Sequence, residues 1–173
     1  VDGCIGTFVL PFLEDLGRPV PPWDFRVEGV TEISGDIHKY GYTPKGASVI
    51  LHRDPDWRDL QWFLYADWPS GIYGSPAVAG ARPAAPIAIA WAAMQHLGRS
   101  GYRTIAQTLL EATAEVRSGI EAIDGLGIVG DPIGPVMAIE ATDPALDIFA
   151  IGDDVDAKGW FTNRNTSPLS MHV

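Results

Sequence analysis

Three features are scarce in this sequence, and each scarcity excludes a class of protein. Cysteine occurs once, at Cys4, which excludes an intrachain disulfide and a metal site built from several thiolates. Lysine and arginine total 12 against 22 aspartates and glutamates, a net charge of −10, so we expect no nucleic-acid partner. The longest apolar run, residues 84–94, is well short of the roughly 20 residues that a membrane span needs.

The composition itself is that of a globular protein. The 173 residues are 46% hydrophobic and 20% charged, enough for one domain or a domain with a small appendage. The chain opens on a strand-like segment, residues 1–5, and closes on the start of another, residues 170–173, so we expect a piece cut from a longer protein. The default location is cytoplasmic, and a membrane anchor in a preceding region stays open.

The spacing of apolar residues predicts an α/β protein. Apolar and polar residues alternate over residues 30–37, and a second strand is expected over 47–52. An alanine-rich helix is expected over residues 84–98, and residues 100–124 repeat apolar side chains every three or four positions, as a helix does. Short strands at 127–129 and 136–141, a helix at 145–157 and a strand near Trp160 complete the expected order.

The middle of the chain is rich in tryptophan and then in turn residues. The six tryptophans, among them Trp57, Trp62 and Trp68, are expected to pack in the core. Glycine and proline follow, and the composition shifts near residue 80, which is the expected domain boundary.

Reactive side chains gather where the first predicted strand ends. Residues 34–39 combine a serine, a carboxylate, an imidazole and an ammonium group in a loop, where a fold can hold them rigidly and within reach. A lysine forms an imine with an aldehyde cofactor when its surroundings lower its pKa, and His38 and Lys45 would supply the cations for this or neutralise a phosphate. The alternative is a solvated turn with a salt bridge between Asp36 and Lys39.

Other polar residues give weaker signals. Asp2 lies in an apolar segment, so it needs either a cationic partner, such as a protonated pyridine nitrogen, or exposure at the chain end. Cys4 alone is best interpreted as a small core residue. Asp36, His38 and His52 lack further ligands at a recognisable spacing, so we expect no metal site.

Three blocks occur in the order VDGC (1–4), SGDIHKYGYTPKG (34–46) and YGSPAVAGARP (73–83). They resemble the pyridoxal-phosphate enzymes of the group II decarboxylase family, and within it most closely the sphingosine-phosphate lyases. The resemblance implies fold-type I, with residues 1–80 as part of the large cofactor-binding domain. Residues 81–173 would then be a connecting helix and part of a small C-terminal α/β domain.

The resemblance also implies roles for the matching residues. Lys39 would carry pyridoxal 5'-phosphate as a Schiff base, and Asp2 would pair with the pyridine nitrogen. His38 would contact the cofactor phosphate, and Cys4 would lie beside the ring. Lys45 would lie near a phosphate of the substrate.

The third block supplies a partner expectation, because Ser75 would lie in a loop that reaches the cofactor of the neighbouring subunit in a homodimer. The sequence departs from the family at Gly3, where alanine is usual, and at Ala81 and Ala84, where serine and glycine are common. The amino-terminal half of the family, which holds the ring-stacking aromatic residue, is not in the chain. The chain alone is therefore expected to bind cofactor poorly.

The function implied is a carbon–carbon lyase that cleaves a phosphorylated sphingoid base, or a similar amino alcohol, to an aldehyde and ethanolamine phosphate. An L-amino-acid decarboxylase would use Lys39 and Asp2 identically, and Lys45 favours the phosphorylated substrate. A non-catalytic, truncated homologue that only dimerises is the remaining alternative.

Overall fold

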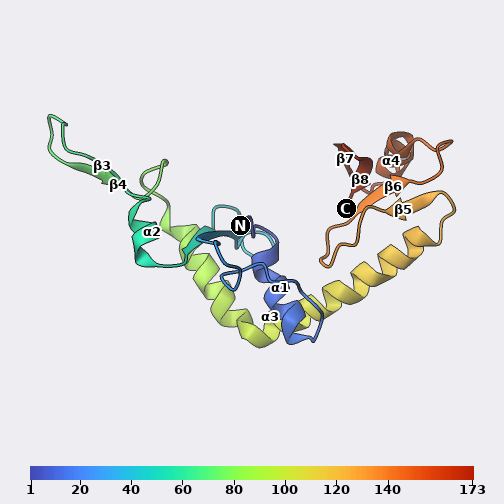
Figure 1. The fold of residues 1–173 in the computed structure, drawn as a ribbon, viewed down its shortest axis with the longest axis horizontal. Helices are drawn as coiled ribbons and strands as arrows, with labels where there is room; N and C mark the ends of the chain where they lie inside the picture. Colours follow the sequence, from blue (N-terminus) through green and yellow to red (C-terminus); the bar gives the residue numbers. More distant parts are fainter. The chain divides into compact units, whose positions relative to one another are not determined.

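A computed structural model describes all of residues 1–173, and it contains two compact units, Val1–Arg103 and Thr104–Val173 (Figure 1). The units divide inside the long helix α3, Ala84–Glu121. The domain boundary expected near residue 80 concerns a complete protein and stays a prediction.

The first unit contains two small antiparallel sheets. Its elements are η1 (Gly6–Phe8), α1 (Leu10–Asp15), β1 (Glu32–Asp36), β2 (Ser48–His52), α2 (Pro55–Asp59), β3 (Phe63–Tyr65), β4 (Tyr73–Ser75) and the beginning of α3. Strand β1 pairs with β2, and β3 pairs with β4. The strands predicted over residues 30–37 and 47–52 are therefore confirmed as β1 and β2.

The strand predicted over residues 1–5 is wrong in its extent. Asp2 alone forms a β-bridge, parallel to Ser34 of β1, and the chain then turns into the 3₁₀ helix η1. Val1 and Asp2 are exposed. A strand needs a run of paired backbone groups, and here the pairing with β1 ends at Gly3, whose N–H donates to the Ser34 carbonyl at 2.9 Å.

The core of the first unit joins the segment after β1 to α3. Ile37, Ala47 and Ala90 are buried together, with Phe8, Val49 and Met94 packed against them. The buried ring of Tyr102 lies 5.5 Å from the rings of both Phe8 and Phe12. Helix α3 thereby supports the loop that carries the candidate lysine.

Helix α3 joins the two helices predicted over residues 84–98 and 100–124. Pro83 immediately precedes the helix, where a missing N–H donor costs little. Gly98 interrupts the helical geometry with φ 58° and ψ −177°, a backbone conformation that is essentially confined to glycine. The two predicted helices are thus confirmed, and a kink at Gly98 separates them.

The second unit contains a four-stranded antiparallel sheet with the order β5-β6-β8-β7, against which one further helix and Ile120 of α3 pack. Its elements after α3 are β5 (Leu126–Ile128), β6 (Ala138–Ala141), α4 (Ile148–Ala157), β7 (Asn163–Thr166) and β8 (Leu169–His172). Ile139, Ile148 and Met171 form its buried centre. The expected order of strands and helix is confirmed, although the strand placed near Trp160 begins at Asn163.

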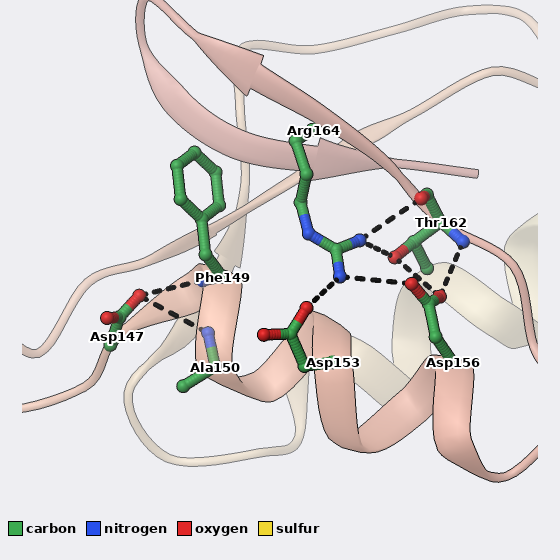
Figure 2. A network of polar contacts seen from close by, with 7 residues as sticks. All are labelled: Asp147, Phe149, Ala150, Asp153, Asp156, Thr162 and Arg164. Atoms are coloured by element: carbon green, nitrogen blue, oxygen red, sulfur yellow. Dashed lines mark hydrogen bonds and ion pairs between the residues drawn. The ribbon is translucent and has the colours of Figure 1, made fainter.

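A polar network joins α4 to β7 within the second unit, as Figure 2 shows. The Arg164 guanidinium donates from Nη2 to Asp153 at 2.8 Å and to Asp156 at 3.1 Å, and from Nη1 to the Thr162 carbonyl at 3.1 Å. Asp147 caps the other end of α4 by accepting from the Phe149 N–H at 2.9 Å. Charged side chains therefore fasten the helix at both ends.

The prediction that the tryptophans pack in the core is wrong for five of the six. Trp57, Trp62, Trp68, Trp91 and Trp160 are 42%, 48%, 55%, 63% and 74% exposed. The first three lie in α2 and around β3, where the segment is a short helix and a two-stranded hairpin with few side chains to pack against them. None of the helices in the structure is long and apolar enough to cross a membrane.

Candidate cofactor-binding site

A tight turn at the end of β1 places Lys39. The Lys39 N–H donates to the Asp36 carbonyl at 3.2 Å, and the His38 N–H donates to the Ala47 carbonyl at 3.2 Å. Ile37, which lies between Asp36 and His38, is buried in the core of the first unit. The backbone of the turn is therefore fixed, while the Lys39 side chain remains 38% exposed.

The residues after the turn are held against α3. The buried Tyr102 hydroxyl donates to the Gly41 carbonyl at 2.9 Å. A Cβ atom at Gly41 would lie 2.3 Å from the Ile37 carbonyl oxygen, so a larger residue cannot occupy this position without moving the turn. The backbone after Lys39 is thus held in place by the Tyr102 hydrogen bond and by the close approach of Gly41 to Ile37.

The N-terminal segment lies beside the first half of β1. Its backbone forms two hydrogen bonds with that of Ser34. The Ser34 N–H donates to the Val1 carbonyl at 3.0 Å, and the Gly3 N–H donates to the Ser34 carbonyl at 2.9 Å. A Cβ atom at Gly3 would lie 2.6 Å from the Ser34 carbonyl oxygen, so glycine permits this approach. Asp2 and Cys4 are thereby brought from the start of the chain toward Lys39.

Asp2 is an exposed carboxylate held in its ionised form. Its Oδ1 accepts from the Cys4 N–H at 3.0 Å and from the Ser34 hydroxyl at 3.3 Å. The Cys4 N–H above all, with the Ser34 hydroxyl and the charge of Lys39, lowers the pKa of Asp2. Of the two possibilities open for Asp2, the structure shows exposure, together with a nearby cation in Lys39.

The Lys39 ammonium lies beside acceptors rather than beside cations. A hydrogen bond with Cys4 and another with Asp36 raise the pKa of Lys39, and Nζ lies 3.1 Å from Asp36 Oδ2. The expectation that His38 and Lys45 would lower this pKa is therefore wrong, because the groups nearest Nζ stabilise its charged form. The salt-bridged turn considered as the alternative is present.

His38 lies between the two strands. Its Nδ1 is 2.9 Å from the Ala47 carbonyl and 3.3 Å from the Ser48 hydroxyl, and its Nε2 is 3.9 Å from Asp36 Oδ2. The ring is therefore anchored beside the Asp36–Lys39 pair. Its predicted contact with a cofactor phosphate stays a prediction.

The other two predicted residues lie apart from this group. Lys45 is exposed in the loop before β2. Ser75 is buried in β4, where its hydroxyl donates to the Ala77 carbonyl at 2.6 Å. No hydrogen bond or ion pair in the structure joins either of them to Asp2, Cys4 or Lys39.

Ser48 belongs to the group and was not predicted. Its hydroxyl donates to Asp36 Oδ1 at 2.6 Å. The two residues lie directly opposite each other in the β1–β2 pairing. The two strands were predicted, but their register was not, and the register is the signal that would have identified Ser48.

His52, which was considered as a possible metal ligand, instead contacts the side chains of Gln61 and Glu32. Its Nε2 lies 3.0 Å from Gln61 Oε1, and its Nδ1 lies 3.2 Å from Glu32 Oε1. No group of three or more His, Cys, Asp or Glu side chains is arranged to hold a metal ion.

The sequence and the fold both resemble known proteins. The sphingosine-1-phosphate lyase of Oryza sativa is 44% identical over 173 residues, which is 100% of this chain and 32% of that protein. The solved structure of the sphingosine-1-phosphate lyase of Burkholderia pseudomallei matches 100% of the chain and 39% of its own with a TM-score of 0.93 at 41% identity. The chain is therefore similar to sphingosine-1-phosphate lyases over its whole length. No family model matches the sequence.

The chain spans about a third of the length of these lyases. The glutamate decarboxylase of Lactobacillus brevis shares the fold, with a TM-score of 0.78 at 21% identity over 99% of this chain and 40% of its own. The predicted α/β class and the likeness to fold-type I pyridoxal-phosphate enzymes are confirmed. The resemblance to the lyases and their group II decarboxylase neighbours is confirmed as well.

The side chains at the end of β1 fit the cofactor that this resemblance implies. Pyridoxal phosphate needs an accessible amine and a carboxylate that can accept a hydrogen bond from its ring nitrogen. Lys39 would supply the amine and Asp2 the ionised carboxylate, whose Oδ1 already accepts from the Cys4 N–H and the Ser34 hydroxyl. Cys4 interacts with both residues, since its N–H donates to Asp2 and its side chain raises the pKa of Lys39.

Proposed function

We propose that this chain is the lysine-bearing part of a pyridoxal-phosphate-dependent carbon–carbon lyase. One observation carries the proposal: Asp2, far from Lys39 in the sequence, forms a β-bridge to Ser34 of β1, the strand that ends in the turn carrying Lys39. The likeness to sphingosine-1-phosphate lyases over the whole chain supports the same proposal.

When bound, pyridoxal phosphate would supply an aldehyde carbon for an amine and a ring that accepts the electron pair of a broken bond. In the proposed site Lys39 would provide that amine. Asp2 would keep a proton on the ring nitrogen through its ionised carboxylate, which the Cys4 N–H and the Ser34 hydroxyl hold in place. Cys4 would lie beside the ring, and His38 would contact the cofactor phosphate.

The proposed substrate is a phosphorylated sphingoid base or a similar amino alcohol, cleaved to an aldehyde and ethanolamine phosphate. Lys45, exposed in the loop before β2, would bind the substrate's phosphate. Ser75 would approach the cofactor of a neighbouring subunit, so the proposed assembly is a homodimer. The cytoplasmic location and the division into residues 1–80 and 81–173 belong to the same proposal.

Borohydride reduction of the complete protein tests the cofactor assignment. Reduction should fix pyridoxal phosphate on Lys39, as detected by mass spectrometry of the peptide that contains it. Lys39→Ala should lose both the fixed cofactor and its absorbance band. Cofactor found on a different lysine, or retained by Lys39→Ala, would contradict the proposal.

The rival function is decarboxylation of an L-amino acid on the same scaffold. It uses Lys39 and Asp2 in the same way, so the site geometry does not separate the two. Product analysis with a phosphorylated sphingoid base, glutamate and an aromatic amino acid does separate them. Release of an aldehyde from the first substrate is expected, and release of carbon dioxide from either amino acid supports the rival.

A further inference from the structure

Asp36 holds two partners with two different oxygens. Its Oδ1 accepts from the Ser48 hydroxyl at 2.6 Å, and its Oδ2 lies 3.1 Å from Lys39 Nζ. The carboxylate side chain is 21% exposed, compared with 38% for the lysine. The acceptor is therefore better shielded from water than the cation that it binds.

The Asp36 carboxylate is also fixed in place, whereas the lysine is not. Asp36 is the last residue of β1 and lies opposite Ser48 in β2, so its backbone and one oxygen are held by the sheet. Lys39 extends from the turn on a flexible stem that loses rotamer freedom when its amine is held. A rigid acceptor next to a flexible lysine defines one resting position for the amine.

The charges around this resting position favour an ionised pair. The Ser48 hydroxyl, and after it Lys39, lowers the pKa of Asp36. Cys4 and Asp36 raise the pKa of Lys39, and Asp2 adds a second negative charge nearby. His38 is the other group facing Asp36, with Nε2 at 3.9 Å from Oδ2.

We propose that Asp36, oriented by Ser48, is the positioning residue that receives the Lys39 ammonium whenever this lysine is not joined to the cofactor. The role rests on the proposed function, because it presumes that Lys39 carries and releases the cofactor. A released amine held at Asp36 stays beside Asp2 and Cys4 and can rejoin the cofactor once product has left. Asp36 itself touches neither substrate nor cofactor in this role.

The test uses the complete protein in four forms: wild type, Asp36→Asn, Ser48→Ala and the control Asp15→Asn. Asp15→Asn removes a different ion pair of the first unit, with Arg99 at 2.6 Å. With cofactor removed, the rate of acetylation of Lys39 is measured against pH by peptide mass spectrometry. Because the Asp36 charge stabilises the ammonium, Asp36→Asn should move the labelling midpoint to lower pH. Ser48→Ala should move it less, and Asp15→Asn not at all.

A second measurement follows the return of Lys39 to the cofactor after a single turnover. Asp36→Asn should slow this return by about two- to fivefold, the range of a partly exposed ion pair, with KM unchanged. If borohydride fixes cofactor on Lys39 but the labelling midpoint and the return rate match wild type, the role of Asp36 is overturned and the proposed function stands. If no cofactor is fixed on Lys39, both are overturned together.

Discussion

At the scale of single residues, the position of Lys39 depends on glycines that allow close backbone approaches and on individual hydrogen bonds. Gly3 and Gly41 allow backbone approaches that a Cβ atom would block. The Tyr102 hydroxyl ties the segment after the lysine to α3. None of these residues carries chemistry, yet each holds the backbone that positions the amine.

The Tyr102 hydroxyl gives the first prediction. Tyr102→Phe keeps the ring contacts with Phe8 and Phe12 and leaves the buried Gly41 carbonyl without its donor. Such a loss costs about 1–3 kcal/mol, so the free energy of unfolding in urea should fall by that amount. Tyr42→Phe, at an exposed tyrosine of the same loop, is the control and should change little.

At the scale of elements, the kink in α3 depends on a single backbone conformation. Gly98 has a positive φ inside the helix, and nothing lies within 4 Å of the Cβ atom that a larger residue would add. The glycine is therefore required by its backbone and not by its surroundings.

Two identical substitutions in α3 should consequently have opposite effects. Gly98→Ala should lower the free energy of unfolding by about 1–3 kcal/mol, the cost of holding alanine in a glycine conformation. Gly119→Ala, at a helical position that is also open, should raise it by about 0.5–1 kcal/mol. Urea denaturation of both variants measures the contrast, and destabilisation by Gly119→Ala would contradict this explanation.

The Arg164 network makes a prediction about coupling. A Cβ atom at Gly152 would lie 2.5 Å from Arg164 Cζ, so Gly152→Ala should push the guanidinium away from Asp153 and Asp156. Arg164→Met should remove the same contacts. Both variants should lower the thermal midpoint, and because they break one network, the double variant should be hardly less stable than either. Additive losses would show that Gly152 acts independently of the network.

The same network should weaken in acid. The Thr162 N–H, followed by the charge of Arg164, lowers the pKa of Asp156 below its ordinary 3.8. A carboxyl whose pKa is lower in the folded state stabilises the fold above the unfolded value, and this contribution is lost as pH falls through the folded value. Asp156→Asn should therefore lower the thermal midpoint at pH 6 and have progressively less effect below 3.8.

Asp154 provides the matched control for that pH series. It lies on the same helix as Asp156, is exposed, and its side chain makes no hydrogen bond or ion pair in the structure. Asp154→Asn should leave the pH dependence of the thermal midpoint unchanged. An equal effect of the two substitutions would point to net charge and not to the network.

At the scale of the whole chain, apolar side chains are exposed along one stretch of the first unit. The stretch covers α2, β3 and β4, and its most exposed members are Leu60 at 76%, Leu64 at 68% and Ile72 at 80%. Soluble monomers rarely expose contiguous apolar surface on this scale. The 173-residue chain therefore presents a surface that other parts of a longer protein, or another chain, would cover.

The last prediction concerns this surface. The 173-residue chain expressed alone should bind a hydrophobic dye and self-associate, because water contacts these side chains directly. Replacing Leu60, Leu64 and Ile72 by glutamine should lower the dye fluorescence and the apparent mass in sedimentation. Val116→Gln, at an exposed apolar residue of α3 outside this stretch, is the control and should leave both nearly unchanged.

The sequence by itself determined the local elements and the candidate lysine. Strands β1 and β2, helix α3 and the order of elements after it follow from the periodicity of apolar residues, a property of neighbouring positions. Lys39 was recognisable because its whole string, residues 34–46, is specific. Both are statements about nearby residues, which is why they could be predicted.

The tertiary structure alone decided what surrounds that lysine. The approach of Asp2 and Cys4 to β1, the register that places Ser48 opposite Asp36 and the effect of Cys4 on the pKa of Lys39 all join residues distant in sequence. Exposure of the tryptophans is likewise decided by what packs near them. Periodicity specifies which face of an element is apolar, but hydrogen bonds and charges act through space, so their partners are known only once the chain has folded.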